Sequence, residues 1–537
     1  MTTRVTERGQ ARSRRAGIGR AALTISIITV VARAAGFGRQ LVFAHTVGPT
    51  CLGTAYTTAN MVPNIIYDVV LGGALSSVVV PVLAGRVGDV ADARRISSAL
   101  LTWTVLLLAP VSLIVAAASG PLASLLLDGA ANCPRSAMDA VGGRMLAVFA
   151  PQILLYGIAV VLYGILQSHR RFTAPALAPL LSTVVVVAAY AWFGHVGGDF
   201  VNGRLGELPL RYETILSAGT TLGVLALVLT AVVPFAWLRL GLRPALRFPP
   251  GVAPRVRRLA AAGVLTLVAQ DTSTVIVVVL ANHFGGSGAL VVYSFAWAVF
   301  VVPYAVLAVP IATTAFPELS SKSGEAVNEA SAAATRMTLL VSCLGTAVLA
   351  GASTPLARVF ESHVGKESSV LALALVAFAP GLIGYGLAAS LTRVLYATGH
   401  SRAPALAVTA GWVLVMIADA VMIPFTAHRL VVAALGLGTA FGLTVAGILL
   451  LVVVLRTRGP SALTGLARAT GAGFAGAAGG IVCGLGVSAV VPATGFFANV
   501  GVTLLVCVVV AVAFTAVVAV TDGGDLRSAL TRVRRDA

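Results

Sequence analysis

The amino-acid sequence predicts an all-α polytopic membrane protein of about fourteen transmembrane helices. Hydrophobic residues make up 58% of its 537 positions and charged residues 10%, whereas a soluble domain carries about 25% charged residues. Apolar runs of about 20 residues or more, long enough to cross a bilayer as a helix, recur along the whole chain. Segments of the first half also return in the second half, in the same order. These three observations leave no place for a large soluble domain.

The apolar runs mark out the expected spans and domains. We place the spans at roughly 21–47, 54–84, 97–127, 139–168, 173–195, 214–238, 257–284, 289–317, 330–353, 369–398, 403–427, 430–455, 464–491 and 495–520. They divide the chain into a basic cytoplasmic tail (1–20), an N-lobe of six spans (21–240) and a cytoplasmic linker (241–256). A C-lobe of six spans (257–456), a final helix pair (457–520) and a second cytoplasmic tail (521–537) follow. Long spans that contain proline are expected to kink or tilt.

The basic residues orient these spans. With the N-terminus inside, 26 of the 37 lysines and arginines fall in cytoplasmic segments and six in external ones. This excess is the positive-inside pattern, so we expect both termini in the cytoplasm. The net charge of +18 comes largely from these short segments, which favours anionic lipid headgroups over nucleic acid as a partner. The basic N-terminus lacks the short apolar region and cleavage site of a signal peptide.

An internal repeat links the two expected lobes. The segment "APALA" occurs twice, beginning at Ala174 and again at Ala403. In addition, "AHTVG" at 44–48 matches "ANHFG" at 281–285, and Tyr56 matches Tyr293. Matched elements lie six spans apart, so the two halves share one orientation in the membrane. Transporters built from such parallel repeats expose a central substrate path alternately to the two sides. The last two spans lie outside the repeat.

Arg33 and Arg39 lie inside the first expected span, where a charge costs about 2.5–3.5 kcal/mol on insertion scales. Six residues of helix offset them by roughly 120°, and a helix break at "GFG", 36–38, would bring them closer. Guanidinium groups suit phosphate oxygens through paired, charge-assisted hydrogen bonds. We therefore expect these arginines to bind substrate. The structural alternative is snorkelling or an ion pair with Asp68.

A polar stripe follows on the second expected span. Asn60, Asn64 and Asp68 recur every four residues, which places them on one face of a helix. Pro63 interrupts the backbone hydrogen bonds of the same helix. A polar stripe beside a broken helix is typical of a span that lines a cavity, so these three residues join the expected substrate site. Ordinary hydrogen bonding between helices is the alternative.

The second half carries embedded acids. Asp271 and Asp419 lie in its first and fifth expected spans. Carboxylates with nearby hydroxyl oxygens hold Na⁺ or shuttle a proton, and we expect such a coupling-ion site here. The alternative is a structural ion pair with Arg393. The candidate hydroxyl neighbours are Thr272, Ser273, Thr439 and Thr444.

Motifs of catalysis are absent from the sequence. The seven histidines show no ligand spacing, and there is no Walker loop or Ser/His/Asp set. The five cysteines form no CxxC or other metal-ligand spacing, so we interpret them as small buried residues. These patterns predict a transporter without ATP hydrolysis and without a resident cofactor.

Four stretches carry a family resemblance: "VARAAGFGRQLVFAHTVG" (31–48), "NMVPNIIYDVVLGGALSSVVVPVL" (60–83), "RFTAPALAPLL" (171–181) and "TRVLYATGHSRAPAL" (392–406). They resemble the MurJ/MviN family, the lipid II flippases of the multidrug/oligosaccharidyl-lipid/polysaccharide exporter superfamily, in its actinobacterial form. The resemblance implies two six-helix lobes around a V-shaped cationic cavity, and two final helices that shape a groove for the lipid tail. It also implies transport of lipid II, the lipid-linked peptidoglycan precursor, across the bacterial cytoplasmic membrane.

The resemblance assigns roles to four of the embedded charges. Arg33 and Arg39 occupy the family's two first-span arginine positions, and Asp271 and Asp419 fall where some members place sodium ligands.

The chain also departs from the family pattern. Gln40 stands in place of an acid, and Tyr67 in place of an arginine that better-known members have. The span around Ala298 lacks another expected arginine, and Val415 replaces a second sodium ligand. The cavity implied by the resemblance is therefore less cationic than the family type.

We expect a monomeric flippase that moves lipid II, or a related undecaprenyl-diphosphate lipid, to the outer leaflet by alternating access. Membrane potential or an ion gradient would drive it. One alternative is an exporter of another polyprenyl-linked glycan or amphiphile, which the missing arginines favour. The other is a non-transporting scaffold that recruits cell-wall synthesis proteins, which are also candidate partners of a flippase.

Overall fold

The computed structural model describes residues 28–69, 83, 90–130, 132–169, 171–200, 205–238, 241–250, 252–313, 319, 324–361, 368–400 and 402–521. Within these ranges all regular secondary structure is helical. This confirms the predicted fold class, and it follows from the solvent, because a helix satisfies its own backbone hydrogen bonds inside a bilayer.

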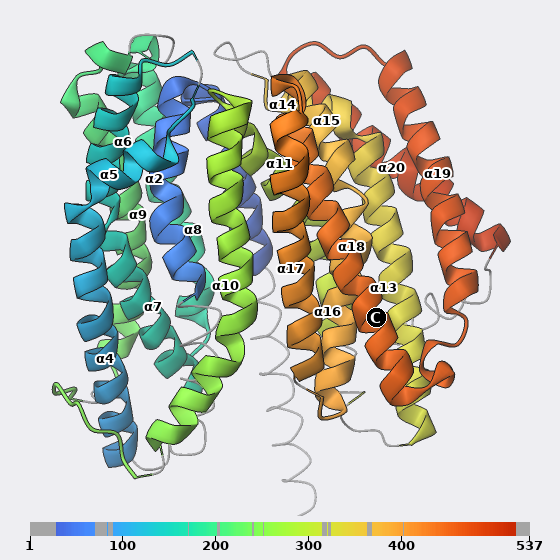
Figure 1. Ribbon diagram of the computed structural model, residues 1–537, viewed down its shortest axis with the longest axis horizontal. Coiled ribbons are helices and arrows are strands. Elements are labelled where there is room, and N and C mark those ends of the chain that lie inside the picture. The colour runs from blue at the N-terminus through green and yellow to red at the C-terminus, as the bar shows by residue number, and fades with distance from the viewer. Residues whose placement is uncertain are drawn as a thin grey trace, which may run out of the picture.

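The first half forms one bundle, coloured blue to green in Figure 1. It begins with a helix at 28–46, which carries Arg33 and Arg39. The helices that follow are α2 (Cys51–Asp68), α4 (Val90–Ala117), α5 (Ser119–Leu126), α6 (Arg135–Phe149), α7 (Pro151–Ser168), α8 (Thr173–Val196) and α9 (Leu210–Ala236). Two short 3₁₀ helices, η2 (Gly198–Phe200) and η3 (Leu205–Glu207), connect α8 to α9.

The second half forms a matching bundle, lime to orange in Figure 1. Its helices are α10 (Val252–Gly285), α11 (Ala289–Pro303), the π-helical η4 (Tyr304–Ala308), α13 (Glu325–Gly351), α14 (Ser353–Val359), α15 (Ser368–Phe378), α16 (Gly381–Ala397), α17 (Arg402–Met422), η5 (Ile423–Phe425), η6 (His428–Leu430) and α18 (Val431–Arg458). A final pair, α19 (Leu466–Val490) and α20 (Phe496–Thr521), follows η7 (Pro460–Leu463) and packs mainly on α13 and α14.

Twelve of the expected spans have counterparts in the described ranges. Eleven helices are long and apolar enough to cross a membrane, and α15 with α16, bent by 44°, makes a twelfth. They correspond to the third to fourteenth predicted spans. The first two predicted spans, 21–47 and 54–84, lie partly outside the described residues. The total of fourteen therefore stays a prediction.

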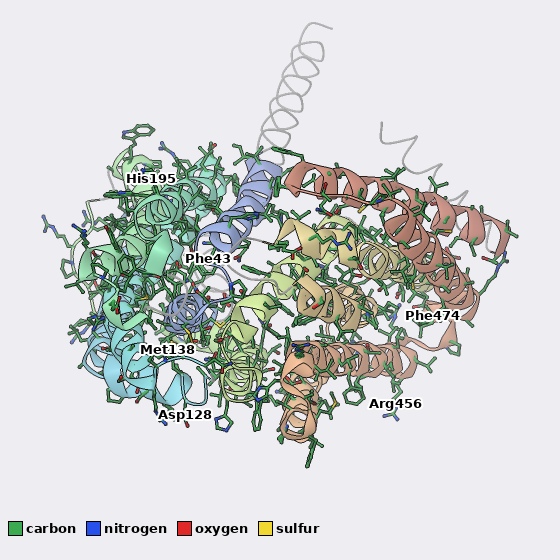
Figure 2. All side chains as sticks on the ribbon, turned by 90° about the horizontal axis from the view of Figure 1, so that it is seen from above. Phe43, Asp128, Met138, His195, Arg456 and Phe474 are labelled. Atoms are coloured by element: carbon green, nitrogen blue, oxygen red, sulfur yellow. A yellow bond between two sulfur atoms is a disulfide. The ribbon has the colours of Figure 1, made fainter. Side chains whose placement is uncertain are left out.

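The helix at 28–46 lies between the two bundles, as the view from above in Figure 2 shows for Phe43. The Phe43 ring packs on Tyr56 and Tyr190 of the first bundle, with ring centroids 5.2 Å apart in both pairs. It also contacts Phe295 of the second bundle at 6.3 Å. The helix runs without a break through 36–38. The break that would have brought the two arginines closer is not present, since glycines inside a membrane helix are tolerated, and the arginines keep their angular offset.

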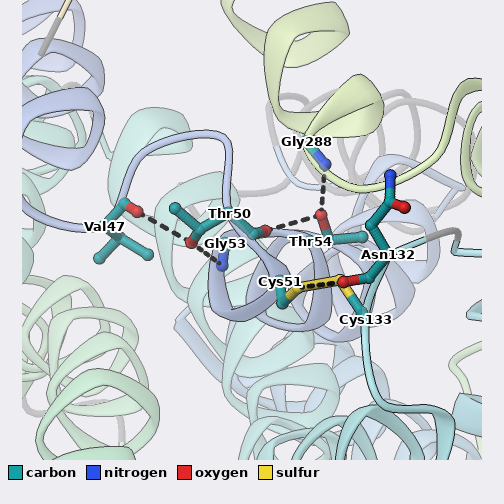
Figure 3. The surroundings of a disulfide bond; sticks show 8 residues. All are labelled: Val47, Thr50, Cys51, Gly53, Thr54, Asn132, Cys133 and Gly288. Carbon is teal, nitrogen blue, oxygen red and sulfur yellow. Dashed lines mark hydrogen bonds between the residues drawn. A yellow bond between two sulfur atoms is a disulfide. The ribbon is translucent and has the colours of Figure 1, made fainter. Parts of the chain in front are cut away.

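A disulfide joins Cys51, at the start of α2, to Cys133, in the loop before α6 (Figure 3). The prediction that all five cysteines are small buried residues is wrong for this pair, and also for Cys483, which is exposed. The two positions are 82 residues apart in sequence, and only the packing of α2 on α6 brings their Cα atoms within 5.8 Å. Of the free cysteines, Cys343 is buried, Cys507 is half-buried and Cys483 is exposed.

The two bundles bond to each other near this disulfide. The Gly288 backbone N–H donates to Thr54 Oγ1 at 2.7 Å, as Figure 3 shows. The Asn282 side-chain amide donates to Thr58 Oγ1 at 3.0 Å and to the Leu126 carbonyl at 2.8 Å. These bonds hold the halves together at the end of the molecule where α2 begins and α10 ends.

Candidate substrate and ion sites

Arg33 and Arg39 lie within electrostatic range of tyrosines in different halves of the molecule. Arg39 is half-buried and lies within electrostatic range of Tyr56, Tyr156 and Tyr190, all in the first bundle. Arg33 is exposed and lies within range of Tyr304 in the second bundle. The continuous helix at 28–46 thus brings one arginine near the tyrosines of each lobe. Two cations on one helix are suited to binding an anion that lies beside that helix.

The structural alternative for these arginines was an ion pair with Asp68. In the part of the chain that the structure describes, the ion pairs are Arg135 with Asp128 and with Asp139, and Arg144 with Glu213. Asp68 is exposed near the end of α2 and lies within electrostatic range of Asp271 on α10. Neither Arg33 nor Arg39 therefore forms an ion pair within the described ranges.

The predicted polar stripe lies against α7. The Asn64 side-chain amide donates to the Asn60 carbonyl at 2.8 Å, and the Tyr156 hydroxyl donates to Asn64 Oδ1 at 3.1 Å. The ring of Tyr67, next to the stripe, contacts that of Tyr156 with centroids 4.2 Å apart and planes tilted by 36°. Asn60 and Asn64 thus take part in hydrogen bonding within the lobe, while Asp68 stays exposed. The wall beside Arg39 presents amide groups and tyrosine rings in place of a third arginine.

Asp419 is fully buried on α17, and neither carboxylate oxygen has a hydrogen-bond partner. Its Oδ1 packs against Gly438 of α18, where a Cβ would clash with it. Thr439, the next residue, and Tyr293 of α11 lie close by, and the Tyr293 hydroxyl is within reach of that of Thr439. The structure thus brings Asp419 and Thr439 together and adds Tyr293.

The other predicted members of the ion site lie elsewhere. Asp271 is 4% exposed on α10, with Oδ2 unpartnered. Thr444 lies on the face of α18 that packs on Gly384 of α16, away from Asp419. Arg393 does not pair with Asp419 but donates to the Ala389 carbonyl at 2.7 Å. The alternative of a structural Arg393–Asp419 ion pair is therefore not seen.

The groups around Asp419 fit a proton better than a metal cation. Hard cations are held by several oxygen ligands, and the side-chain hydroxyls grouped with Asp419 are those of Tyr293 and Thr439. One turn earlier, Val415 is fully buried and packs on Gly442. Across the described ranges no three His, Cys, Asp or Glu side chains gather as metal ligands. An ionised carboxylate without partners is costly to bury, so this packing suits the neutral acid.

Comparison with known proteins places the chain in a family. Residues 43–521 match the family model described as lipid II flippase MurJ. The chain belongs to the MurJ family. The lipid II flippase MurJ of Burkholderia cenocepacia is 26% identical over 477 residues, which cover 82% of this chain and 84% of that protein. The probable lipid II flippase MurJ of Rhizobium meliloti is 26% identical over 400 residues, or 71% of each chain.

Solved structures share the fold. A lipid II flippase MurJ in an inward closed conformation superposes with a TM-score of 0.72 at 18% identity, covering 93% of this chain and 99% of that one. An inward-facing multidrug MATE transporter of the MOP superfamily gives 0.64 at 14% identity, covering 81% and 98%. The family model confirms the predicted membership of the MurJ family, and these structures show that the fold is shared.

Within this MurJ-family chain, sequence reasoning considered Arg393 only as an ion-pair partner and missed the two tyrosines, Tyr304 and Tyr385, of the same lobe. Arg393 lies within electrostatic range of Tyr304, as Arg33 does. Tyr304 stacks on Tyr385, with ring centroids 3.9 Å apart. The internal repeat could have identified Tyr304 as the counterpart of Tyr67, because the interval between them equals the interval from Tyr56 to Tyr293.

Proposed function

We propose that the protein is a flippase that moves lipid II from the inner to the outer leaflet of the bacterial cytoplasmic membrane by alternating access. The observation that carries this proposal is the arginine pair on the helix at 28–46, in a chain of the MurJ family. Arg39 lies within electrostatic range of tyrosines in the first lobe and Arg33 of a tyrosine in the second, and neither forms an ion pair in the described ranges. Charge-assisted hydrogen bonds from two guanidinium groups suit a diphosphate.

The disulfide and the loop charges both support an orientation with the termini in the cytoplasm. Disulfides persist in oxidising compartments, so the Cys51–Cys133 end of the molecule faces outward. The positive-inside pattern gives the same result, with both termini in the cytoplasm. The bonds from Gly288 and Asn282 to the first bundle then close the outer side. Outward opening requires these bonds to break while the lobes rock about the substrate held by Arg33 and Arg39.

The driving force acts through buried acids or through the membrane potential. Asp419 and Asp271 exchange a coupling ion, for which the surroundings of Asp419 favour H⁺ over Na⁺, and Thr439 assists at the same site. A charge that crosses the membrane gains about 2.3 kcal/mol per 100 mV. The protein works as a monomer, without enzymatic chemistry, and hands lipid II to cell-wall synthesis proteins outside.

The test is complementation of a bacterial strain depleted of its own lipid II flippase. The Arg33→Ala and Arg39→Ala variants should each fail to restore growth while reaching normal abundance in the membrane. The matched control is Arg135→Ala, because Arg135 is an exposed arginine whose side chain is 71% accessible. Full growth with both span variants would contradict the proposed function.

A second candidate function is export of another polyprenyl-linked glycan or amphiphile. Tyr67 stands where the resemblance leads one to expect an arginine, and α11 carries no arginine. A less cationic site suits a headgroup with less negative charge. Purified protein that binds and moves a different polyprenyl glycan, and leaves lipid II in place, would favour this candidate.

A further inference from the structure

Two tyrosine pairs occupy matching places in the two lobes. Tyr67 of α2 and Tyr156 of α7 lie with ring centroids 4.2 Å apart. Tyr304 of η4 and Tyr385 of α16 lie 3.9 Å apart, with their planes inclined by 22°. Each pair joins the second predicted span of its lobe to the fourth. All four side chains are half-buried.

The internal repeat relates the two pairs to each other. The interval from Tyr67 to Tyr304 is the same as that from Tyr56 to Tyr293. The interval from Tyr156 to Tyr385 is the same as that between the two copies of "APALA". The pairs are therefore two copies of one feature, one on each lobe.

Charged and polar groups surround each pair. Arg39 lies within electrostatic range of Tyr156, whose hydroxyl donates to Asn64 Oδ1 at 3.1 Å. Arg33 and Arg393 lie within range of Tyr304. An anion held by the two arginines of the helix at 28–46 would thus have an aromatic pair on either side.

The tyrosine pairs differ from the aromatic core of the same lobes. Tyr56 and Tyr190 are 3% and 4% exposed, and their hydroxyls bond to each other, as expected of structural residues. The paired tyrosines are more accessible. Tyr304 also begins a π-helical segment directly after Pro303, and such π-bulges occur frequently at functional sites.

We propose that the Tyr67–Tyr156 and Tyr304–Tyr385 pairs are platforms for the sugar rings of a diphosphate-linked glycolipid. The apolar C–H face of a pyranose packs on the electron-rich face of an aromatic ring, and the tyrosine hydroxyls and Asn64 supply hydrogen bonds to sugar hydroxyls. This inference rests on the proposed function, because the arginines must hold the diphosphate that places the sugars. It also gives a role to Tyr67, which stands where the family resemblance leads one to expect an arginine: its ring would stack on a sugar in place of a charge contact.

The experiment measures binding of two lipids to the purified full-length protein in nanodiscs. Lipid II carries diphosphate and sugars, and undecaprenyl diphosphate carries the diphosphate alone. Tyr67→Leu and Tyr304→Leu should each weaken lipid II binding about fivefold, the scale of one aromatic contact, and leave undecaprenyl diphosphate binding unchanged. Arg33→Ala and Arg39→Ala should weaken binding of both lipids.

Conservative variants and a matched control complete the design. Tyr67→Phe and Tyr304→Phe keep the ring and should retain most of the preference for lipid II. Tyr396→Leu changes a tyrosine of α16 that is 48% exposed and should alter neither affinity. If Tyr67→Leu and Tyr304→Leu weaken both lipids equally, or neither, the platform proposal is overturned.

A third ligand separates this proposal from the proposed function. Saturation-transfer NMR with the free disaccharide of lipid II should detect its ring protons on the wild-type protein and lose them with the two leucine variants. Disaccharide binding without diphosphate-lipid binding would overturn the flippase assignment and keep the platforms. Binding of both diphosphate lipids with equal affinity, with or without the sugar, would overturn the platforms and keep the flippase assignment.

Discussion

The two lobes carry the same buried polar cluster in different chemical forms. In the first lobe the Tyr56 hydroxyl bonds to Tyr190 and to Thr220, both at 2.7 Å, and Phe149 packs edge-on against Tyr56 with ring centroids 5.5 Å apart. In the second lobe Tyr293, Asp419 and Thr439 occupy the corresponding positions. Phe378 lies beside Tyr293, also at 5.5 Å.

The correspondence between the clusters follows the internal repeat. Asp419 follows Tyr190 at the same interval that separates the two copies of "APALA". Thr220 and Thr439 each stand in a G-T-x-x-G segment, at 219–223 and 438–442, whose glycines let α8 approach α9 and α17 approach α18.

A single difference, Asp419 in the second lobe at the position that corresponds to Tyr190 in the first, therefore separates an ionisable cluster from a structural one. The first lobe satisfies its hydroxyls internally, whereas the second buries a carboxylic acid whose two oxygens have no partner. The hydrogen-bonded cluster of the first lobe is therefore rigid, whereas the cluster of the second lobe is sensitive to protonation of Asp419. We infer that ion coupling resides in the second lobe.

The largest effect on this difference between the lobes is expected from Tyr190→Asp, which places in the first lobe the acid found in the second. It removes a ring that is 4% exposed and should lower the free energy of unfolding by about 3–5 kcal/mol. Denaturation by SDS in mixed micelles measures it. Wild-type stability in this variant would show that the first-lobe cluster is not structural.

The disulfide is a second feature found in the first lobe, and Cys51→Ser should reveal what it contributes. Loss of a link between residues 82 apart should lower the free energy of unfolding by about 2–4 kcal/mol. Cys343→Ser, at a free buried cysteine of the second lobe, serves as the control. Equal effects of the two serine variants would mean that Cys51 and Cys133 are not bonded in the protein.

A matched pair of glycine variants separates packing from chemistry. A Cβ at Gly219 would clash with Ala189, and one at Gly438 with the Asp419 carboxylate. Both alanine variants should lose about 1–3 kcal/mol of stability. Transport per folded molecule, measured in proteoliposomes, should fall only with Gly438→Ala. A similar fall with Gly219→Ala would remove the distinction between the lobes.

The smallest expected difference is between Tyr56→Phe and Tyr293→Phe. Tyr56 makes two hydrogen bonds within its cluster, so its loss should cost about 1–2 kcal/mol of unfolding free energy. Tyr293→Phe should cost under about 1 kcal/mol but change the dependence of transport on the pH gradient. The reverse order of stability losses would contradict the assignment.

Much of this architecture was predictable from patterns that repeat. The apolar runs predicted the third to fourteenth spans, and "APALA" with Tyr56 and Tyr293 predicted the paired lobes. The same spacing would have matched Asp419 with Tyr190, but that pairing becomes informative only when the first-lobe hydrogen bonds are visible.

Other features depend on packing that local sequence does not encode. Cys51 and Cys133 meet because α2 lies on α6, and no spacing rule indicates a bond across 82 residues. Arg393 was considered as a partner for Asp419, yet α16 carries it toward Tyr304 instead. Which side of a helix meets which neighbour is decided by the whole bundle.

The central claim is tested most directly by lipid II flipping in proteoliposomes that contain the purified full-length protein. We predict that labelled lipid II crosses the bilayer, that an imposed pH gradient accelerates the crossing, and that Asp419→Asn removes this acceleration. Arg33→Ala with Arg39→Ala should abolish the crossing. Lipid II that crosses no faster with the wild-type protein than in protein-free liposomes would contradict the account.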